Sequence, residues 1–112
     1  MRFDISNEKI ERTIYERYGR DLFEFVNCAL SHFKGKHLVS EHTDLQFYIS
    51  DYYYEDDEEY PLMCNFNFVF QVFGLKDQHK KFGKKYLFTN YRAKDWSCQN
   101  RHFEEIPIIE QE

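Results

Sequence analysis

Histidine and cysteine are the residue types in this 112-residue sequence that could bind a transition metal. A zinc site needs four such ligands close together, usually in pairs with a short spacing. Cys98 and His102 are four positions apart, and no two cysteines are separated by only two residues. The other pair, His37 and His42, has a spacing of five. These four side chains match no standard zinc spacing, so we expect no metal site and no cofactor.

Catalytic motifs are not recognisable in the sequence, which has no GxSxG, no glycine-rich phosphate loop and no HExxH. Two sets of side chains have the chemistry of a nuclease, one metal-dependent and one based on histidine. They are Asp44, Asp51, Asp77 and Lys85 for the first, and His79, Lys81 and His102 for the second. Most acidic proteins of this size offer comparable sets, so we predict no catalytic residues and keep a small enzyme as the third hypothesis.

Basic and aromatic residues are interleaved through residues 76–101, which is typical of nucleic-acid binding. Lysine and arginine contact phosphates, while aromatic rings stack on bases. The residues concerned are Lys76, Lys80, Lys81, Phe82, Lys84, Lys85, Tyr86, Tyr91, Arg92, Lys94, Trp96 and Arg101. The 20 carboxylates of the whole chain oppose binding to a polyanion. A nucleic-acid-binding protein, or a phage protein that blocks a host defence enzyme, is therefore the second hypothesis.

Tyrosine and acidic residues gather in the segment 51–60, which is the strongest indication of a binding surface. Tyrosine is enriched at protein interfaces because its ring offers a large contact area with few rotatable bonds. Neighbouring carboxylates complement lysine and arginine and raise the rate of association with a basic partner. In the alternative interpretation, Tyr53 continues the buried face of the preceding strand. The predicted partner-binding residues are Asp51, Tyr53, Glu55, Asp56, Asp57, Glu58, Glu59 and Tyr60.

Charge is divided unevenly along the chain, whose formal net charge is −5. Residues 1–60 carry 14 Asp/Glu against 7 Lys/Arg, whereas residues 61–103 carry 2 against 8. The acidic block is 55–59, and the basic block is 76–85. Since like charges repel each other and stay solvated, both blocks are expected to be loops.

Residues 7–34 have the apolar spacing of two short helices or one kinked helix. Ser6 or Asn7 can cap the first helical turn. Further on, Asp21 with Glu24 three positions later resembles a capping box for a second helical segment. The apolar stripe of that segment is expected to be buried, and its members are Leu22, Phe25, Val26, Ala29, Leu30 and Phe33.

After residue 44 the apolar period changes from 3.6 to 2, which predicts β-strands. The segments expected to be extended are 45–50, 62–72, 86–91, a short stretch around 96–98, and 106–109. The longest of these has a clear alternation. Its predicted buried face consists of Leu62, Cys64, Phe66, Phe68, Phe70 and Val72.

Helices followed by a run of strands are typical of the α+β class. We therefore predict a single domain, 1–112, with N-terminal helices (about 7–34) packed on one face of an antiparallel sheet of three to five strands. The acidic and basic blocks flank the longest strand, so they are expected at opposite ends of the sheet. Three cysteines, an odd number, favour free thiols in a cytoplasmic protein. No apolar run approaches the roughly 18 residues of a membrane span.

Small size, acidity and the lack of a catalytic motif favour an inhibitor. Our first hypothesis is an immunity-type protein, or antitoxin, that binds a basic bacterial toxin and covers its active site. A nuclease is the favoured target, because acidic side chains can occupy a groove that otherwise holds phosphates. The expected partner is thus a basic protein, and the chain itself is expected to be a monomer or a weak homo-oligomer.

Overall fold

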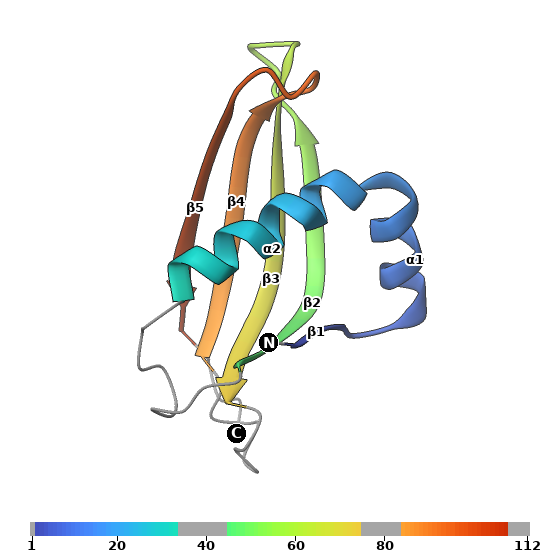
Figure 1. Cartoon of the computed structure of the whole chain (residues 1–112). Coiled ribbons are helices and arrows are strands. Elements are labelled where there is room, and N and C mark those ends of the chain that lie inside the picture. Colours follow the sequence, from blue (N-terminus) through green and yellow to red (C-terminus); the bar gives the residue numbers. More distant parts are fainter. Residues whose placement is uncertain (1, 34–44, 75–83, 108–112) are drawn as a thin grey trace.

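The computed structural model describes residues 2–33, 45–74 and 84–107, which form two helices and a five-stranded sheet. The elements are β1 (Arg2–Ile5), α1 (Glu8–Arg17), α2 (Gly19–Phe33), β2 (Leu45–Asp56), β3 (Met63–Gly74), β4 (Lys84–Ala93) and β5 (Gln99–Ile106). Both helices lie on one side of the sheet, and α2 crosses the strands (Figure 1). The predicted α+β class, with N-terminal helices on one face of a sheet, is confirmed.

β1 makes the sheet mixed, because it runs parallel to β2 with Phe3 opposite Phe47. The strands β2 to β5 follow one another as an antiparallel meander in the order β1-β2-β3-β4-β5. Neighbouring parallel strands need a crossover connection, and α1 and α2 lie in that connection. β1 is not predicted from the sequence, because its four residues are too few to show a period of two.

The two helices are separated by one residue, Tyr18. Asn7 caps α1, since its side-chain oxygen accepts the backbone N–H of Ile10 at 2.9 Å. Tyr18 leaves the helical backbone conformation, and its N–H donates to the carbonyl of Ile14 as α1 ends. α2 begins at the next residue, Gly19, so the predicted segment 7–34 forms two helices and not one kinked helix.

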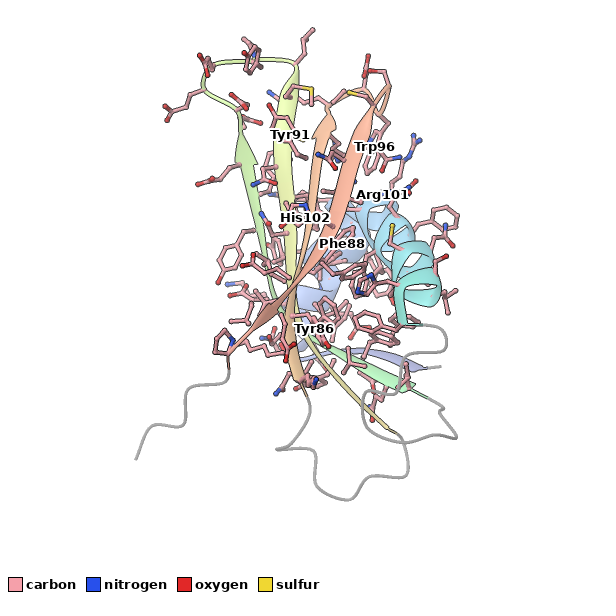
Figure 2. The ribbon with its side chains drawn as sticks, turned by 90° about the vertical axis from the view of Figure 1, so that its left-hand side faces the viewer. Tyr86, Phe88, Tyr91, Trp96, Arg101 and His102 are labelled. Atoms are coloured by element: carbon pink, nitrogen blue, oxygen red, sulfur yellow. The ribbon has the colours of Figure 1, made fainter. Side chains whose placement is uncertain are left out.

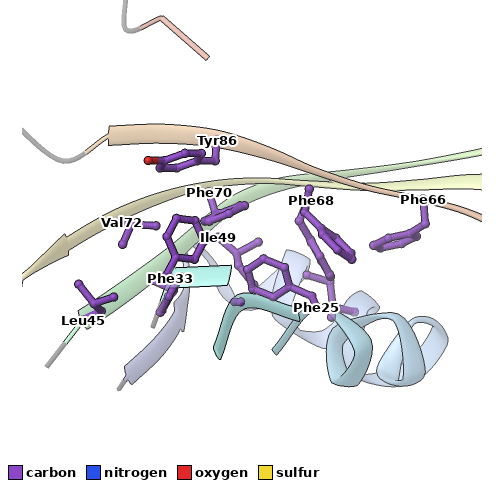
Figure 3. Close-up of a cluster of buried hydrophobic side chains, with 13 residues drawn as sticks. Phe25, Phe33, Leu45, Ile49, Phe66, Phe68, Phe70, Val72 and Tyr86 are labelled. Carbon is purple, nitrogen blue, oxygen red and sulfur yellow. The ribbon is translucent and has the colours of Figure 1, made fainter. Parts of the chain in front are cut away.

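The hydrophobic core lies between α2 and the sheet (Figure 3). The ring of Phe25 packs edge-on against Phe68 and Phe70, with centroid distances of 5.2 and 4.8 Å. The predicted buried face of β3 is confirmed for Cys64, Phe66, Phe68, Phe70 and Val72. The predicted burial of Leu62 and Leu30 is wrong, because these side chains are 79% and 41% exposed.

A buried ion pair joins α2 to β4. Arg92 Nε and Nη2 donate to the two carboxylate oxygens of Asp21 at 2.9 and 3.1 Å. The ring of Trp96 lies 3.8 Å from the guanidinium of Arg92 and also contacts that of Arg20. Burial raises the pKa of Asp21, and the hydrogen bond and charge of Arg92 oppose this rise. The predicted capping role of Asp21 is wrong, because Asp21 lies inside the first turn of α2 and pairs with a distant strand.

Three expectations about the other segments need correction. Glu55 and Asp56 belong to β2, so only residues 57–59 of the acidic block lie in the connection to β3. The stretch around 96–98 forms a turn, and the strand follows it as β5. Of the basic block, Lys84 and Lys85 begin β4, while residues 75–83 lie outside the described residues. β4 begins, at Lys84, at the end of the sheet opposite the β2–β3 connection (Figure 1).

Candidate partner-binding site

A β-bulge in β2 decides which of its tyrosines face outward. Ile49 lies opposite Phe70 and Asp51 lies opposite Val69, so Ser50 is an extra residue in β2. The hydroxyl of Ser50 donates to the carbonyl of Val69 at 3.3 Å. Because side chains alternate between faces along a strand, one extra residue reverses the alternation. Odd-numbered residues face the helices before the bulge, and even-numbered residues do so after it.

Tyr53 is exposed as a result of this reversal. Tyr52 and Tyr54 pack against Tyr18, with ring centroids 5.4 and 5.7 Å apart, whereas Tyr53 lies on the opposite face and is 52% exposed. Its hydroxyl donates to the carboxylate of Asp51 at 2.9 Å, which raises the pKa of Tyr53. The alternative in which Tyr53 continues the buried face is therefore excluded.

Asp57 shapes the turn between β2 and β3. One of its carboxylate oxygens accepts the backbone N–H groups of Glu59 and Tyr60 at 2.8 and 3.0 Å. The other accepts the hydroxyl of Tyr91 in β4 at 2.6 Å. These bonds favour the charged carboxylate, so the pKa of Asp57 is lowered, while that of Tyr91 is raised to about 12. The carboxylate of Asp57 thus forms hydrogen bonds within the fold.

Asp56 is also bound within the chain. Its Oδ1 accepts the hydroxyl of Tyr54 at 2.9 Å and lies 3.2 Å from the ammonium of Lys94. The two hydrogen bonds lower the pKa of Asp56, with Tyr54 as the larger cause. Asp56 is therefore charged, but Lys94 balances this charge, so the carboxylate is less available to a partner than its place in the sequence predicts.

Three carboxylates at this end of the sheet remain without a partner among the described residues. Glu55, Glu58 and Glu59 are exposed and take part in no side-chain hydrogen bond or ion pair with this part of the chain. Two large side chains of the same turn, Tyr60 and Leu62, are 59% and 79% exposed. We call this surface the acidic tip, and it consists of Tyr53, Glu55, Glu58, Glu59, Tyr60 and Leu62.

A depression of about 440 Å³ lies beside the acidic tip. It is lined by Glu55, Asp56, Asp57, Glu58, Asn65 and Tyr91. The side-chain oxygen of Asn65 is buried and accepts no hydrogen bond in the described structure. An unpaired carbonyl oxygen among carboxylates suits a donor that carries positive charge, such as the ammonium of lysine or the guanidinium of arginine.

Leu62, Asn65 and Tyr91 also belong to this region, although the sequence pattern does not place them there. Asn65 and Tyr91 come together because they are direct partners across β3 and β4. Leu62 follows the apolar alternation of β3, and only the turn that ends before Met63 removes it from the core. The pairing of the strands is what identifies these residues as part of the region, and a single sequence does not show this pairing.

The described part of the basic and aromatic segment, residues 84–101, is largely engaged within the chain. Four of its cations form ion pairs with carboxylates: Lys84 with Glu105, Arg92 with Asp21, Lys94 with Asp56, and Arg101 with Glu24. Tyr86 is buried and Trp96 covers Arg92, so neither ring is free to stack on a base. Lys76, His79, Lys80, Lys81 and Phe82 lie outside the described residues.

The cysteines and histidines do not gather in the described part of the chain. Cys64 is buried, Cys28 is half-buried and Cys98 is exposed, and all three are free thiols. Burial raises the pKa of Cys28. Within residues 2–33, 45–74 and 84–107, no group of three or more His, Cys, Asp and Glu side chains could hold a metal ion. His37 and His42 lie outside these ranges, as do Asp44 and Asp77.

Comparison with protein-family models, with curated proteins and with solved structures yields no significant match for this chain. Among the helices of the described residues, none is long and apolar enough to cross a membrane. The function therefore has to be inferred from the geometry and charge of the acidic tip.

Proposed function

We propose that this chain is a small cytoplasmic inhibitor of immunity (antitoxin) type, which binds a basic protein through the acidic tip. The proposed target is the nuclease domain of a bacterial toxin. The observation that carries this proposal is the combination, at one end of the sheet, of three large exposed side chains and three carboxylates that have no partner among the described residues.

The two kinds of side chain have different roles in binding. Glu55, Glu58 and Glu59 attract a basic surface over several ångströms and so raise the rate of association. Tyr53, Tyr60 and Leu62 are the large apolar side chains of the tip, and their burial in a complex slows dissociation. This division is typical of interfaces in which charge steers the partner and aromatic side chains hold it.

A nuclease is the favoured partner because its substrate site must bind phosphates with lysine and arginine. Carboxylates on a narrow projecting turn can enter such a site and pair with the same cations. The depression lined by Asn65 and Tyr91 can then accept one lysine or arginine side chain of the partner. The acidic tip can thus enter the substrate site of a basic partner, and the depression beside the tip can accept a side chain of that partner.

The experiment measures inhibition of nucleic-acid cleavage by purified basic nuclease domains of bacterial toxins, together with binding to each domain. The test variant combines Glu55→Gln, Glu58→Gln and Glu59→Gln. The control variant combines Glu8→Gln, Glu11→Gln and Glu16→Gln, which removes the same charge from exposed positions of α1. We expect the test variant to associate with its nuclease at least about tenfold more slowly at low salt, while the control stays close to the unchanged chain.

Equal association rates for the two variants, with a nuclease that the unchanged chain inhibits, would place the interface away from the acidic tip. A chain that inhibits no basic nuclease in the panel, but shifts a nucleic acid in a gel, would replace the inhibitor proposal with nucleic-acid binding.

A further inference from the structure

β5 is an edge strand whose outer side has no partner strand among the described residues. It is eight residues long and contains neither glycine nor proline, whereas the opposite edge, β1, has four residues. Figure 2 looks onto this edge, with α2 on one side of it. The outer side of an edge strand presents backbone N–H and C=O groups that can pair with another strand.

The side chains of β5 are divided between the two faces of the sheet. Phe103 packs against Phe88 in the core, with ring centroids 5.2 Å apart, so it faces the helices. Arg101 lies on the same face, because its Nη1 is 2.6 Å from a carboxylate oxygen of Glu24 in α2. Glu105, two residues beyond Phe103, shares this face.

The other face carries His102 and Glu104. Their neighbours on β4 are Thr89 and Leu87. Both side chains are exposed, and neither forms a hydrogen bond or ion pair with another described residue. On each face of β5, therefore, a basic or imidazole side chain precedes an acidic one.

We propose that two copies of this chain associate through β5, as antiparallel neighbours whose two-fold axis passes through Phe103. In this register Arg101 lies opposite Glu105 of the second copy, and His102 lies opposite Glu104 of the second copy. Each pair occurs twice. Arg101 and Glu105 already form ion pairs with Glu24 and Lys84 of their own chain. His102 and Glu104 have no other described partner, so their pair is the one that dimerisation would add. The two five-stranded sheets join into one continuous sheet, with the helices of both copies on the same face.

Charge selects this register over its neighbours. Moving the axis by one residue, to His102 or to Glu104, places two identical side chains opposite each other and separates both complementary pairs. Opposite charges across antiparallel strands stabilise the pairing, and like charges destabilise it. Among the registers that place the helices of both copies on the same face, only the axis at Phe103 gives complementary pairs on both faces, and it also brings the two Phe103 rings together beside the core.

Among the described residues, no strand pairs with the outer side of β5. A depression of about 620 Å³ is lined by residues of α2 and of the middle of β5, among them Ser31, Arg101 and Phe103. The antiparallel arrangement also places the acidic tips of the two copies at opposite ends of the joint sheet. The association therefore leaves each acidic tip accessible, and it does not depend on the function proposed for that tip.

The test is sedimentation velocity of the purified chain over a wide range of concentrations. We expect the mass to rise from 13.9 kDa towards twice that value with increasing concentration. His102→Glu places a new carboxylate opposite Glu104 on both sides of the axis, and we expect dimerisation to weaken at least about tenfold. The double variant His102→Glu/Glu104→Lys restores opposite charges across the axis and should dimerise again. Circular dichroism confirms that each variant is folded.

Two results would overturn the proposal. The first is a monomer at all concentrations up to the solubility limit. The second is a dimer whose affinity is unchanged by His102→Glu, or not restored in the double variant, because such a dimer uses another surface or another register.

Discussion

Asp57 and Asp21 are charged side chains that bind other residues of the same chain. Asp57 lies in the predicted binding segment, yet its two oxygens accept three hydrogen bonds that shape the turn. Asp21 resembles a helix cap in the sequence, yet it neutralises a buried arginine of β4. The type of a residue and its neighbours in the sequence therefore indicate a local role. The role in the folded protein depends on which distant side chain the residue contacts.

The charge of Asp57 makes the stability of the protein depend on pH. Its pKa is lowered in the folded state, so the carboxylate stabilises the fold above the ordinary Asp pKa, and this contribution is lost as the pH falls through the folded pKa. We expect Asp57→Asn to lower the urea midpoint of unfolding at neutral pH. The difference from the unchanged chain should shrink below about pH 4. A difference that is the same at neutral and acidic pH would contradict this role of the charge.

The buried pair of Asp21 and Arg92 gives a second prediction. Arg92→Met leaves Asp21 buried without its cation, and we expect a loss of about 3–5 kcal/mol in the free energy of unfolding. Asp21→Leu leaves Arg92 unpaired and should cost a similar amount. The double variant removes both charges and should lose less than the sum of the two single variants, as measured by urea unfolding. Additive losses would show that the two side chains act independently.

At the scale of the element, β2 shows how one residue changes a surface. The bulge at Ser50 brings Tyr52 and Tyr54 onto the side chain of Tyr18 and turns Tyr53 to the other face. The same strand thus contributes to the core along its first half and to a candidate interface along its second half.

β3 supplies the centre of the core, and this gives a prediction for the element. Phe68 is fully buried between Phe25 and Phe88, so we expect Phe68→Ala to lower the free energy of unfolding by about 3–5 kcal/mol. Phe23→Ala is the matched control, because Phe23 is 62% exposed on α2. Its expected cost is below about 1 kcal/mol. Equal losses in chemical denaturation would mean that Phe68 does not occupy the core.

At the scale of the whole molecule, the charge is arranged so that one end of the sheet differs from the other. Most described cations of the basic segment are neutralised by carboxylates from other elements, which leaves few of them for a polyanion. At the acidic tip, by contrast, three carboxylates have no such partner in the described structure. The charge left without a described partner at the β2–β3 end of the sheet is therefore acidic and suits a basic partner.

The tyrosines of the acidic tip can be distinguished from its carboxylates by binding kinetics. With an identified nuclease partner, we expect Tyr53→Ala and Tyr60→Ala to speed dissociation, each costing about 2 kcal/mol or more of binding free energy. Tyr15→Ala is the control, because Tyr15 is similarly exposed on α1 at 61%. Surface plasmon resonance at two salt concentrations separates this effect from the slower association of the glutamate variant. Tyrosine variants that dissociate no faster than the control would remove the rings from the interface.

The sequence alone determines the α+β class, the helical region near 7–34, the buried face of β3 and the acidic character of residues 51–60. These features depend on local periodicity and composition, which neighbouring residues establish. The parallel strand β1, the bulge at Ser50 and the partners of Asp21 and Asp57 are decided only by the tertiary structure. Each depends on residues far apart in the chain, such as Asp21 and Arg92, and no local pattern specifies which distant side chain a charged group will meet.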